Sequence, residues 1–309
     1  MSISCSTAPK DSQPTREVSK TASEYAVFGN KFYREGRYRE AEEMYLYSLQ
    51  YYRRIDNRVG ILNSYNSLGK TYLADDSAED AERVFKTALR ISERIEREGV
   101  FPQEELAPLR AEIINNLGET ALRRGNNDSA LEHFNAGIEI LSSKEHEKEL
   151  AVLLHNRGSV YVRKGSYEKA REDLMSSLKI NSSLEAHTER ASNYYMLSRL
   201  ASREGDFTLA KTYGLKALEF DKISENSVGI AQDLIALGHI AAEENKLAES
   251  GDYYIRAYRI YDSLNLDSGV EKVVEYLRRV GADSYIAEEE PGVEIDVEEQ
   301  ETMPTIPSE

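Results

Sequence analysis

Apolar and polar residues follow one spacing along most of the chain. From about residue 22 to residue 264, apolar residues recur three and four positions apart. This spacing places them on one face of an α-helix. None of the seven prolines lies between Leu109 and Glu290. Because proline costs about 3 kcal/mol inside a helix, this long stretch, rich in Ala, Leu, Glu, Arg and Lys, predicts an almost entirely helical protein.

One short motif returns six times within this helical pattern. Its copies read YAVFGNKF, YNSLGKTY, INNLGETA, LHNRGSVY, YYMLSRLA and LIALGHIA. The central small residue of each copy lies, in order, at Gly29, Gly69, Gly118, Gly158, Ser198 and Gly238. The spacings between these residues are 40, 49, 40, 40 and 40 positions. Self-similarity at such a period indicates stacked supersecondary units.

Each repeated position has a physical reason. The small residue lets two helices approach closely. Seven positions later stand residues that enter a left-handed turn at low cost, namely Gly36, Asp76, Gly125, Gly165, Gly205 and Asn245. A second small residue follows, at Ala41, Ala81, Ala130, Ala170, Ala210 and Ser250. Larger residues come next, such as Tyr45, Phe85, Phe134, Leu174 and Tyr254. Each unit is therefore predicted to be a helix A, a tight turn and an antiparallel helix B.

This pattern resembles the tetratricopeptide repeat over roughly residues 22–264. The period of about 40 exceeds the usual period of ~34 residues. The proline that often ends helix B in the family is absent from every unit, so the units resemble the extended variant of the repeat. The resemblance implies an all-α fold, a right-handed α-solenoid of six helix-turn-helix repeats plus a C-terminal capping helix.

The domain organisation follows from these positions. The repeats are expected near residues 22–55, 62–95, 111–144, 151–184, 191–224 and 231–264, within a solenoid spanning 22–281. The irregular spacing of 49 contains Gly99 and Pro102. Gly99 is expected to cap one helix, and Pro102 to prevent its continuation. This segment is predicted to be a surface loop, in which Phe101 either contacts a partner or tucks against neighbouring helices.

The two ends of the chain differ from the repeats. Residues 267–281 predict a capping helix, with a stripe at Val270, Val273, Leu277 and Val280 and a capping box made by Ser268 and Glu271. Residues 1–21 and 282–309 are predicted to be disordered tails. The segment 284–309 holds nine acidic residues and no basic one, a composition that cannot bury enough apolar surface to fold.

Composition narrows the function by exclusion. The net charge of −16 disfavours broad electrostatic binding to nucleic acid or to anionic lipid. No apolar run reaches the roughly 18 residues of a membrane-spanning helix. The single Cys5 excludes an internal disulfide framework. The five histidines show no metal-ligand spacing, and no phosphate-binding loop or nucleophile elbow is present. We therefore expect neither an enzyme nor a cofactor.

Candidate binding residues come from helix A, because in this family helix A lines the concave face of the superhelix. Arginine recurs five positions after the small residue, and asparagine clusters near it. Arginine offers forked donors to carboxylates, and asparagine can hold a peptide backbone. The alternative is that these cations only complement the helix dipole. The candidates are Asn30, Arg34, Asn66, Lys70, Asn115, Asn116, Arg123, His155, Asn156, Arg163, Tyr195, Arg199 and Arg203.

The expected function is that of a protein–protein interaction scaffold or adaptor, which binds a peptide or helical segment of a partner in the concave groove. The arginines favour an acidic partner. One alternative is a regulatory sensor switched by a peptide or by its own acidic tail. Another is a lipid-anchored envelope assembly factor, in which Cys5 would carry the anchor. The residues before Cys5 provide no export signal, which favours a cytoplasmic protein unless the true start lies upstream, in which case a bacterial lipoprotein anchored through Cys5 is the alternative. The sequence predicts no oligomeric state.

Overall fold

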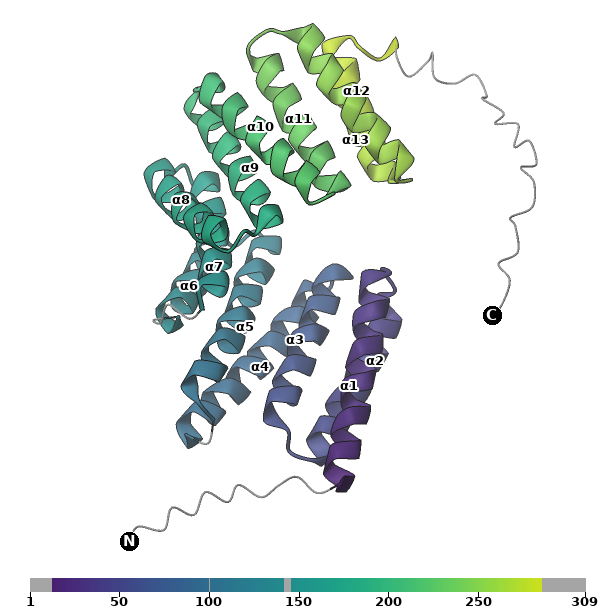
Figure 1. The fold of residues 1–309 in the computed structure, drawn as a ribbon, viewed down its shortest axis with the longest axis vertical. Coiled ribbons are helices and arrows are strands. Elements are labelled where there is room, and N and C mark those ends of the chain that lie inside the picture. The colour runs from purple at the N-terminus through teal and green to yellow at the C-terminus, as the bar shows by residue number, and fades with distance from the viewer. Residues whose placement is uncertain (1–12, 100, 142–145, 285–309) are drawn as a thin grey trace, which may run out of the picture. The chain divides into compact units, whose positions relative to one another are not determined.

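The computed structural model describes residues 13–99, 101–141 and 146–284 (Figure 1). Within these ranges all regular structure is helical, as predicted. The thirteen helices are α1 Gln13–Arg34, α2 Tyr38–Arg54, α3 Arg58–Ala74, α4 Ala78–Glu98, α5 Gln103–Arg123, α6 Asn127–Ile140, α7 Glu147–Arg163, α8 Tyr167–Ser183, α9 His187–Glu204, α10 Phe207–Ile223, α11 Ser227–Glu243, α12 Leu247–Ser263 and α13 Asp267–Val280.

The chain divides into two compact units, residues 1–220 and residues 221–309. In the first unit, each helix from α1 to α8 packs against the next one. The odd-numbered helices also contact one another, α3 with α5, α5 with α7 and α7 with α9. These odd-numbered helices are the predicted A helices. They therefore form one layer, and the B helices cover its other side. In the second unit, α11 packs on α12 and α12 packs on α13.

The small residue of the motif allows helices A and B to touch. A methyl group built on Gly69 would lie 2.4 Å from the Phe85 ring, and one on Gly118 would lie 2.4 Å from Phe134. Ser198 replaces glycine in the fifth unit, and its hydroxyl donates to the Ala210 carbonyl at 2.7 Å. The predicted close approach, with a large side chain of helix B facing the small residue, is confirmed at Gly69 and Gly118.

The turn between helices A and B is also confirmed. All six residues predicted to adopt the left-handed conformation do so, with φ between 59° and 83°; they are Gly36, Asp76, Gly125, Gly165, Gly205 and Asn245. Asp76 and Asn245 hold this conformation with a side chain, which aspartate and asparagine tolerate better than most residues.

The hydrophobic core is shared between neighbouring helix–turn–helix repeats. Phe85 of α4 belongs to the same buried cluster as Leu62 of α3 and Leu117 of α5. Likewise, Leu174 of α8 clusters with Val162 of α7 and Leu197 of α9. Burying one such leucine side chain contributes roughly 1.5–3 kcal/mol. A repeat alone would leave its share of each cluster exposed, so adjacent repeats stabilise one another.

Two helices begin earlier than the sequence analysis placed them. Helix α1 begins at Gln13, so residues 13–21 are helical rather than part of a disordered tail. Pro14 does not prevent this, since proline is tolerated in the first turn. Helix α5 begins at Gln103 and includes Pro108, ahead of the expected start of the third repeat near residue 111. Residues 1–12 and 285–309, on which both predicted tails fall, lie outside the described residues.

The segment between α4 and α5 has the predicted capping residue. Gly99 ends α4 in the left-handed conformation, with φ 62°. Phe101 packs against the cluster that contains Leu106 and Ile113, so it tucks against neighbouring helices.

Helix α13 is the predicted capping helix, and it packs on α12. Val273 and Leu277 are fully buried. The predicted capping box is wrong. The residue before the helix is Leu266, and no side chain caps the first turn, because Ser268 already lies inside the helix. Among the described residues, no helix combines the length and apolar character needed to cross a lipid bilayer.

Candidate functional site

Two adjoining cavities lie on the A-helix side of the first unit. One has a volume of about 400 Å³ and is lined by residues of α3, α5 and α7. The other, of about 340 Å³, is lined mainly by residues of α1, α2 and α3. Lys70 and Glu112 line both cavities. We call the residues that line the two cavities the A-helix groove; its polar members include Asn30, Asn66, Lys70, Glu112, Asn115, Asn116, Glu119, Lys148 and Glu149.

Buried amides join α3 to α5 at the base of the groove. The Asn116 amide nitrogen donates to the Asn66 amide oxygen at 2.7 Å. Both side chains are about 5% exposed. Buried polar groups are costly unless they are hydrogen-bonded, and this bond satisfies one end of each amide. The two residues therefore hold neighbouring A helices in register.

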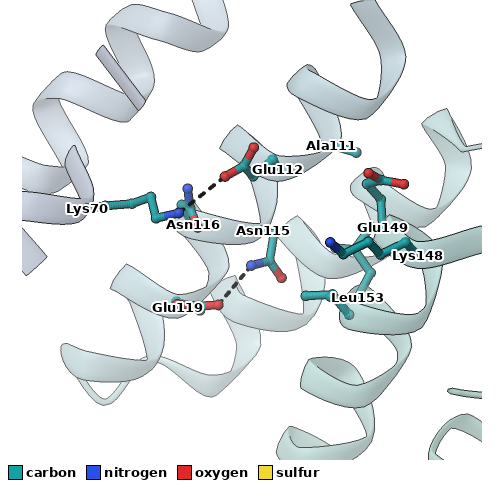
Figure 2. A pocket seen from close by; sticks show the side chains of 10 residues that line it. Lys70, Ala111, Glu112, Asn115, Asn116, Glu119, Lys148, Glu149 and Leu153 are labelled. Carbon is teal, nitrogen blue, oxygen red and sulfur yellow. Dashed lines mark hydrogen bonds and ion pairs between the residues drawn. The ribbon is translucent and has the colours of Figure 1, made fainter. Parts of the chain in front are cut away.

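A second amide network joins α5 to α7. The Asn115 amide nitrogen donates to the Glu119 carboxylate at 2.8 Å, a bond visible in Figure 2. Asn156 of α7 donates to the Asn115 amide oxygen at 2.8 Å and to the same Glu119 carboxylate at 3.2 Å. Glu119 thus accepts hydrogen bonds from two helices. Its negative charge is held at a fixed place on the groove wall.

The charges of the groove are mixed. The Lys70 ammonium lies 3.4 Å from the Glu112 carboxylate (Figure 2), and both side chains remain nearly half exposed. The larger cavity is lined by three carboxylates and two ammonium groups, those of Glu112, Glu119, Glu149, Lys70 and Lys148. Val152 adds an apolar surface that is 39% exposed. A bound segment would meet amides, both signs of charge and one small apolar contact.

The predicted arginines lie elsewhere on the A helices. None of Arg34, Arg123, Arg163 and Arg203 is among the residues that line the two cavities, although all four are exposed. The Arg34 guanidinium folds back to donate to the Asn30 carbonyl at 3.3 Å. The Arg123 guanidinium lies 4.0 Å from the Asp76 carboxylate. The cations that line the larger cavity are lysines instead.

The remaining predicted residues lie on α7 and α9. The two ring nitrogens of His155 are hydrogen-bonded to the Asn193 amide at 3.1 Å and to the Ser192 hydroxyl at 3.3 Å. Burial lowers the pKa of His155 below its usual value. Arg199 lies over the Tyr195 ring, 5.8 Å from its centroid. The structure therefore divides the predicted set into the groove residues, the exposed arginines and this α7–α9 cluster.

Sequence reasoning did not select Glu119, Lys148 or Glu149. Glu119 stands directly after Gly118, the same repeat position that selected Asn30 and Lys70, so that position could have identified it. Lys148 and Glu149 lie at the start of α7, more than two helical turns before the motif glycine. Only the packing of α5 on α7 places them beside Glu112.

One buried pair of carboxyl groups lies in the second unit. Asp233 of α11 is 1% exposed and Asp221 of α10 is 5% exposed. Asp221 accepts a hydrogen bond from the Asn226 amide at 3.0 Å, whereas one Asp233 oxygen has no hydrogen-bond partner. Burial, followed by the charge of Asp221, raises the pKa of Asp233 to about 8. Within the described residues, no group of three or more histidine, cysteine or acidic side chains is arranged to hold a metal ion.

Comparisons with known proteins agree with the repeat pattern. The family model of the tetratricopeptide repeat matches residues 29–94 and 149–223. Together with the helix pairs described above, this match shows that the chain contains tetratricopeptide repeats. A comparison with curated protein sequences gives no match.

Solved structures share the fold at low sequence identity. The apo form of RapI aligns with a TM-score of 0.63 and 18% identity, covering 87% of this chain and 72% of that one. BtubC from P. vanneervenii aligns with a TM-score of 0.58 and 16% identity, covering 83% and 94%. A Rap protein complexed with competence and sporulation factor aligns with a TM-score of 0.59 and 16% identity, covering 89% and 73%. At these identities the likeness concerns the fold alone.

Proposed function

We propose that the chain is a protein–protein interaction scaffold that holds an extended segment of a partner along the A-helix groove. The observation that carries the proposal is the pair of adjoining cavities joined through Lys70 and Glu112. Successive A helices supply amide side chains to these cavities. Each amide has two donor hydrogens and an acceptor oxygen, which match the alternating groups of an extended peptide backbone.

The charges of the groove favour a neutral or basic segment. Three carboxylates face two ammonium groups in the larger cavity, and Lys70 is already paired with Glu112. An acidic segment, including the acidic C-terminal residues of this chain, would meet net repulsion there. The exposed arginines, such as Arg123 and Arg163, remain candidates for contacts with acidic residues that flank the bound segment.

A fold neighbour supports a binding role. One Rap protein with the same fold was crystallised as a complex with competence and sporulation factor. Repeat proteins of this kind present extended surfaces on which partners bind. Several moderate contacts spread along such a surface can supply affinity without one deep pocket.

Photo-cross-linking from the groove tests the proposal. We would replace Val152 with p-benzoylphenylalanine in the full-length chain and irradiate it in a lysate of the cells that make it. Val228 of α11 is the matched control, because both valines are 39% exposed and only Val152 lines the groove. We expect a discrete cross-linked protein from position 152 and none from position 228. Equal adducts at both positions, or none at either, would contradict the proposal.

A charge-neutral variant then tests which segment binds. Glu119→Gln keeps an oxygen that can accept the Asn115 and Asn156 hydrogen bonds but removes the negative charge. For a basic segment we expect the Kd of the cross-linked partner to rise by about tenfold, since a hydrogen bond to a charged group contributes about 1.5–3 kcal/mol. Glu139→Gln, at an exposed position on α6, is the control. An unchanged Kd for Glu119→Gln would show that its charge does not take part.

A further inference from the structure

The outer face of α1 has the construction of an internal packing surface. In the second, third and fifth repeats, the residue before the motif's small residue is Leu68, Leu117 or Leu197, each at most 2% exposed. Helix B of the preceding repeat covers this position. Leu68 clusters with Tyr45 and Leu49 of α2, and Leu197 clusters with residues of α8.

The first repeat presents the same position to solvent. Phe28 occupies it and is 53% exposed, and the adjacent Val27 is 61% exposed. Together with Ser19 and Ser23 they line a shallow depression on α1. A phenylalanine at a position that is buried in later repeats indicates that this face receives another helix.

The charged residues around Phe28 indicate which helix covers this face of α1. Lys20, Glu24, Val27, Phe28, Lys31 and Glu35 form one stripe, because their spacings of three and four residues return to the same side of a helix. The stripe reads Lys, Glu, apolar, apolar, Lys, Glu. When it is turned end to end about the midpoint between Val27 and Phe28, position 20 falls opposite position 35 and position 24 falls opposite position 31. Every lysine then faces a glutamate.

The helix geometry makes both pairs symmetric. Glu35 directly follows the last residue of α1, and its backbone N–H still donates to the Lys31 carbonyl at 3.1 Å, as in a helix. With a rise of 1.5 Å per residue, Lys20 and Glu35 therefore each lie about 11 Å from the midpoint. Within one chain, Lys20 lies 3.7 Å from Glu24, and Lys31 lies 3.9 Å from Glu35. Glu35 also accepts a hydrogen bond from the Arg37 guanidinium at 3.2 Å. All of these side chains are at least 39% exposed, so the internal ion pairs are weak and can be exchanged for pairs between chains.

We propose that this face of α1 binds the same face of a second copy of the chain. The two α1 helices pack antiparallel about a two-fold axis between Val27 and Phe28, with both apolar residues of each copy at the centre. Lys20 pairs with Glu35 of the second copy, and Glu24 pairs with Lys31 of the second copy. Such an isologous contact is self-complementary and closes into a dimer.

Sedimentation equilibrium of the full-length chain tests the association. As the concentration rises, we expect the weight-average mass to increase from the chain mass of 35.0 kDa towards twice that value. High salt weakens the pairs between chains, so the dissociation constant should be larger at about 0.5 M than at about 0.05 M NaCl. A chain that remains monomeric up to the highest soluble concentration overturns the proposal.

Charge reversal separates a contact between copies from an effect on the helix. Lys20→Glu alone and Glu35→Lys alone each place like charges opposite one another, twice per dimer. We expect each to weaken the dimer about tenfold or more. A mixture of the two variants restores opposite charges across the interface and should form a heterodimer at wild-type strength. Their internal repulsions remain in the mixture, so recovery can only come from the contact between chains. Failure to recover overturns the arrangement.

Replacing Phe28, at the apolar centre of the proposed interface, tests whether a second copy of the chain binds this face of α1. Phe28→Asp should abolish the dimer, whereas Met175→Asp, at a position on α8 that is 45% exposed, should leave it intact. Circular dichroism of both variants checks that the helices remain folded. A dimer that survives Phe28→Asp overturns the proposal, because it would use another surface.

Discussion

Two junctions use the same repeat position in different ways: the junction between α8 and α9 in the first unit, and the junction between Asp221 and Asp233 in the second unit. Asn193 and Asp233 each stand five residues before the small residue of helix A, and each is 1% exposed. The Asn193 amide is hydrogen-bonded to the Ser177 hydroxyl at 2.8 Å and to His155 at 3.1 Å. Asp233 faces Asp221 and keeps one oxygen without a partner. An amide both donates and accepts, whereas a carboxylate can only accept, so the aspartate pair must retain a proton.

These two junctions respond to pH in opposite directions. The pKa of His155 is lowered by burial, so the unfolded chain binds the proton more readily. Stability from this histidine is present above the ordinary value of about 6.5 and is lost as the pH falls. The pKa of Asp233 is raised to about 8, so the folded chain binds the proton more readily. Stability from this carboxyl is present below its ordinary value near 4 and is lost as the pH rises towards 8.

The largest loss of stability should follow from placing an amide at Leu153 of α7, where the same repeat position is apolar. Leu153 occupies the same repeat position in the fourth unit, is 1% exposed and clusters with Phe134 and Leu141. We expect Leu153→Asn to lower the free energy of unfolding by about 3–5 kcal/mol, because it loses apolar contacts and buries an amide without partners. Urea unfolding measures this. Val152→Asn, next to it but 39% exposed, should cost no more than about 0.5 kcal/mol.

A pair of aspartates introduced at the α8–α9 junction should also destabilise the protein, but only at pH values above the ordinary pKa of aspartate. Asn181 and Asn193 occupy the positions equivalent to Asp221 and Asp233, forty residues earlier. For the double variant Asn181→Asp with Asn193→Asp, we expect a loss of about 2–4 kcal/mol at pH 8, from unpaired buried charge. The loss should shrink at pH 5, as measured by urea unfolding at both values. A loss that is equal at both pH values would contradict the carboxyl explanation.

The reverse exchange should stabilise the protein at high pH. Asp233→Asn gives Asp221 an amide donor and removes the second negative charge. We expect a gain of about 1–3 kcal/mol at pH 9 and little change at pH 5, since the Asp233 carboxyl is protonated there. Thermal unfolding across this range measures the gain. Asp252→Asn, at an exposed position on α12, is the control and should show no such pH dependence.

The smallest effect should come from the histidine. His155→Gln removes the group that must take up a proton when the wild-type chain unfolds at low pH. We expect the loss of stability between about pH 7 and pH 5 to be smaller in the variant than in the wild-type chain, because burial lowers the pKa of His155 in the folded chain only. Parallel urea titrations at the two pH values measure it. An unchanged acid-side slope would mean that another group carries the effect.

The sequence predicted those parts of the fold that one repeat determines by itself. The small residue at Gly69 and the left-handed turn at Asp76 depend on local geometry, and both are confirmed. The charges of the groove depend on contacts between repeats, such as that between Asn156 and Asn115, 41 positions apart. The sequence of a single repeat does not specify such contacts. The capping box at Ser268 was wrong because the serine lies two residues after the N-cap position, which Leu266 occupies; sequence patterns do not place helix ends to within two residues.

The cores shared between neighbouring helices restrict how the chain can change in length. One residue inserted within a helix would rotate all later side chains by about 100° and move residues such as Phe85 away from their glycines. The unit with the long spacing avoids this. Helices α4 and α5 each have 21 residues where α3 has 17, an increment close to one full helical turn. Natural insertions and deletions in such a protein should therefore occur in steps of about a turn, or fall between Gly99 and Pro102.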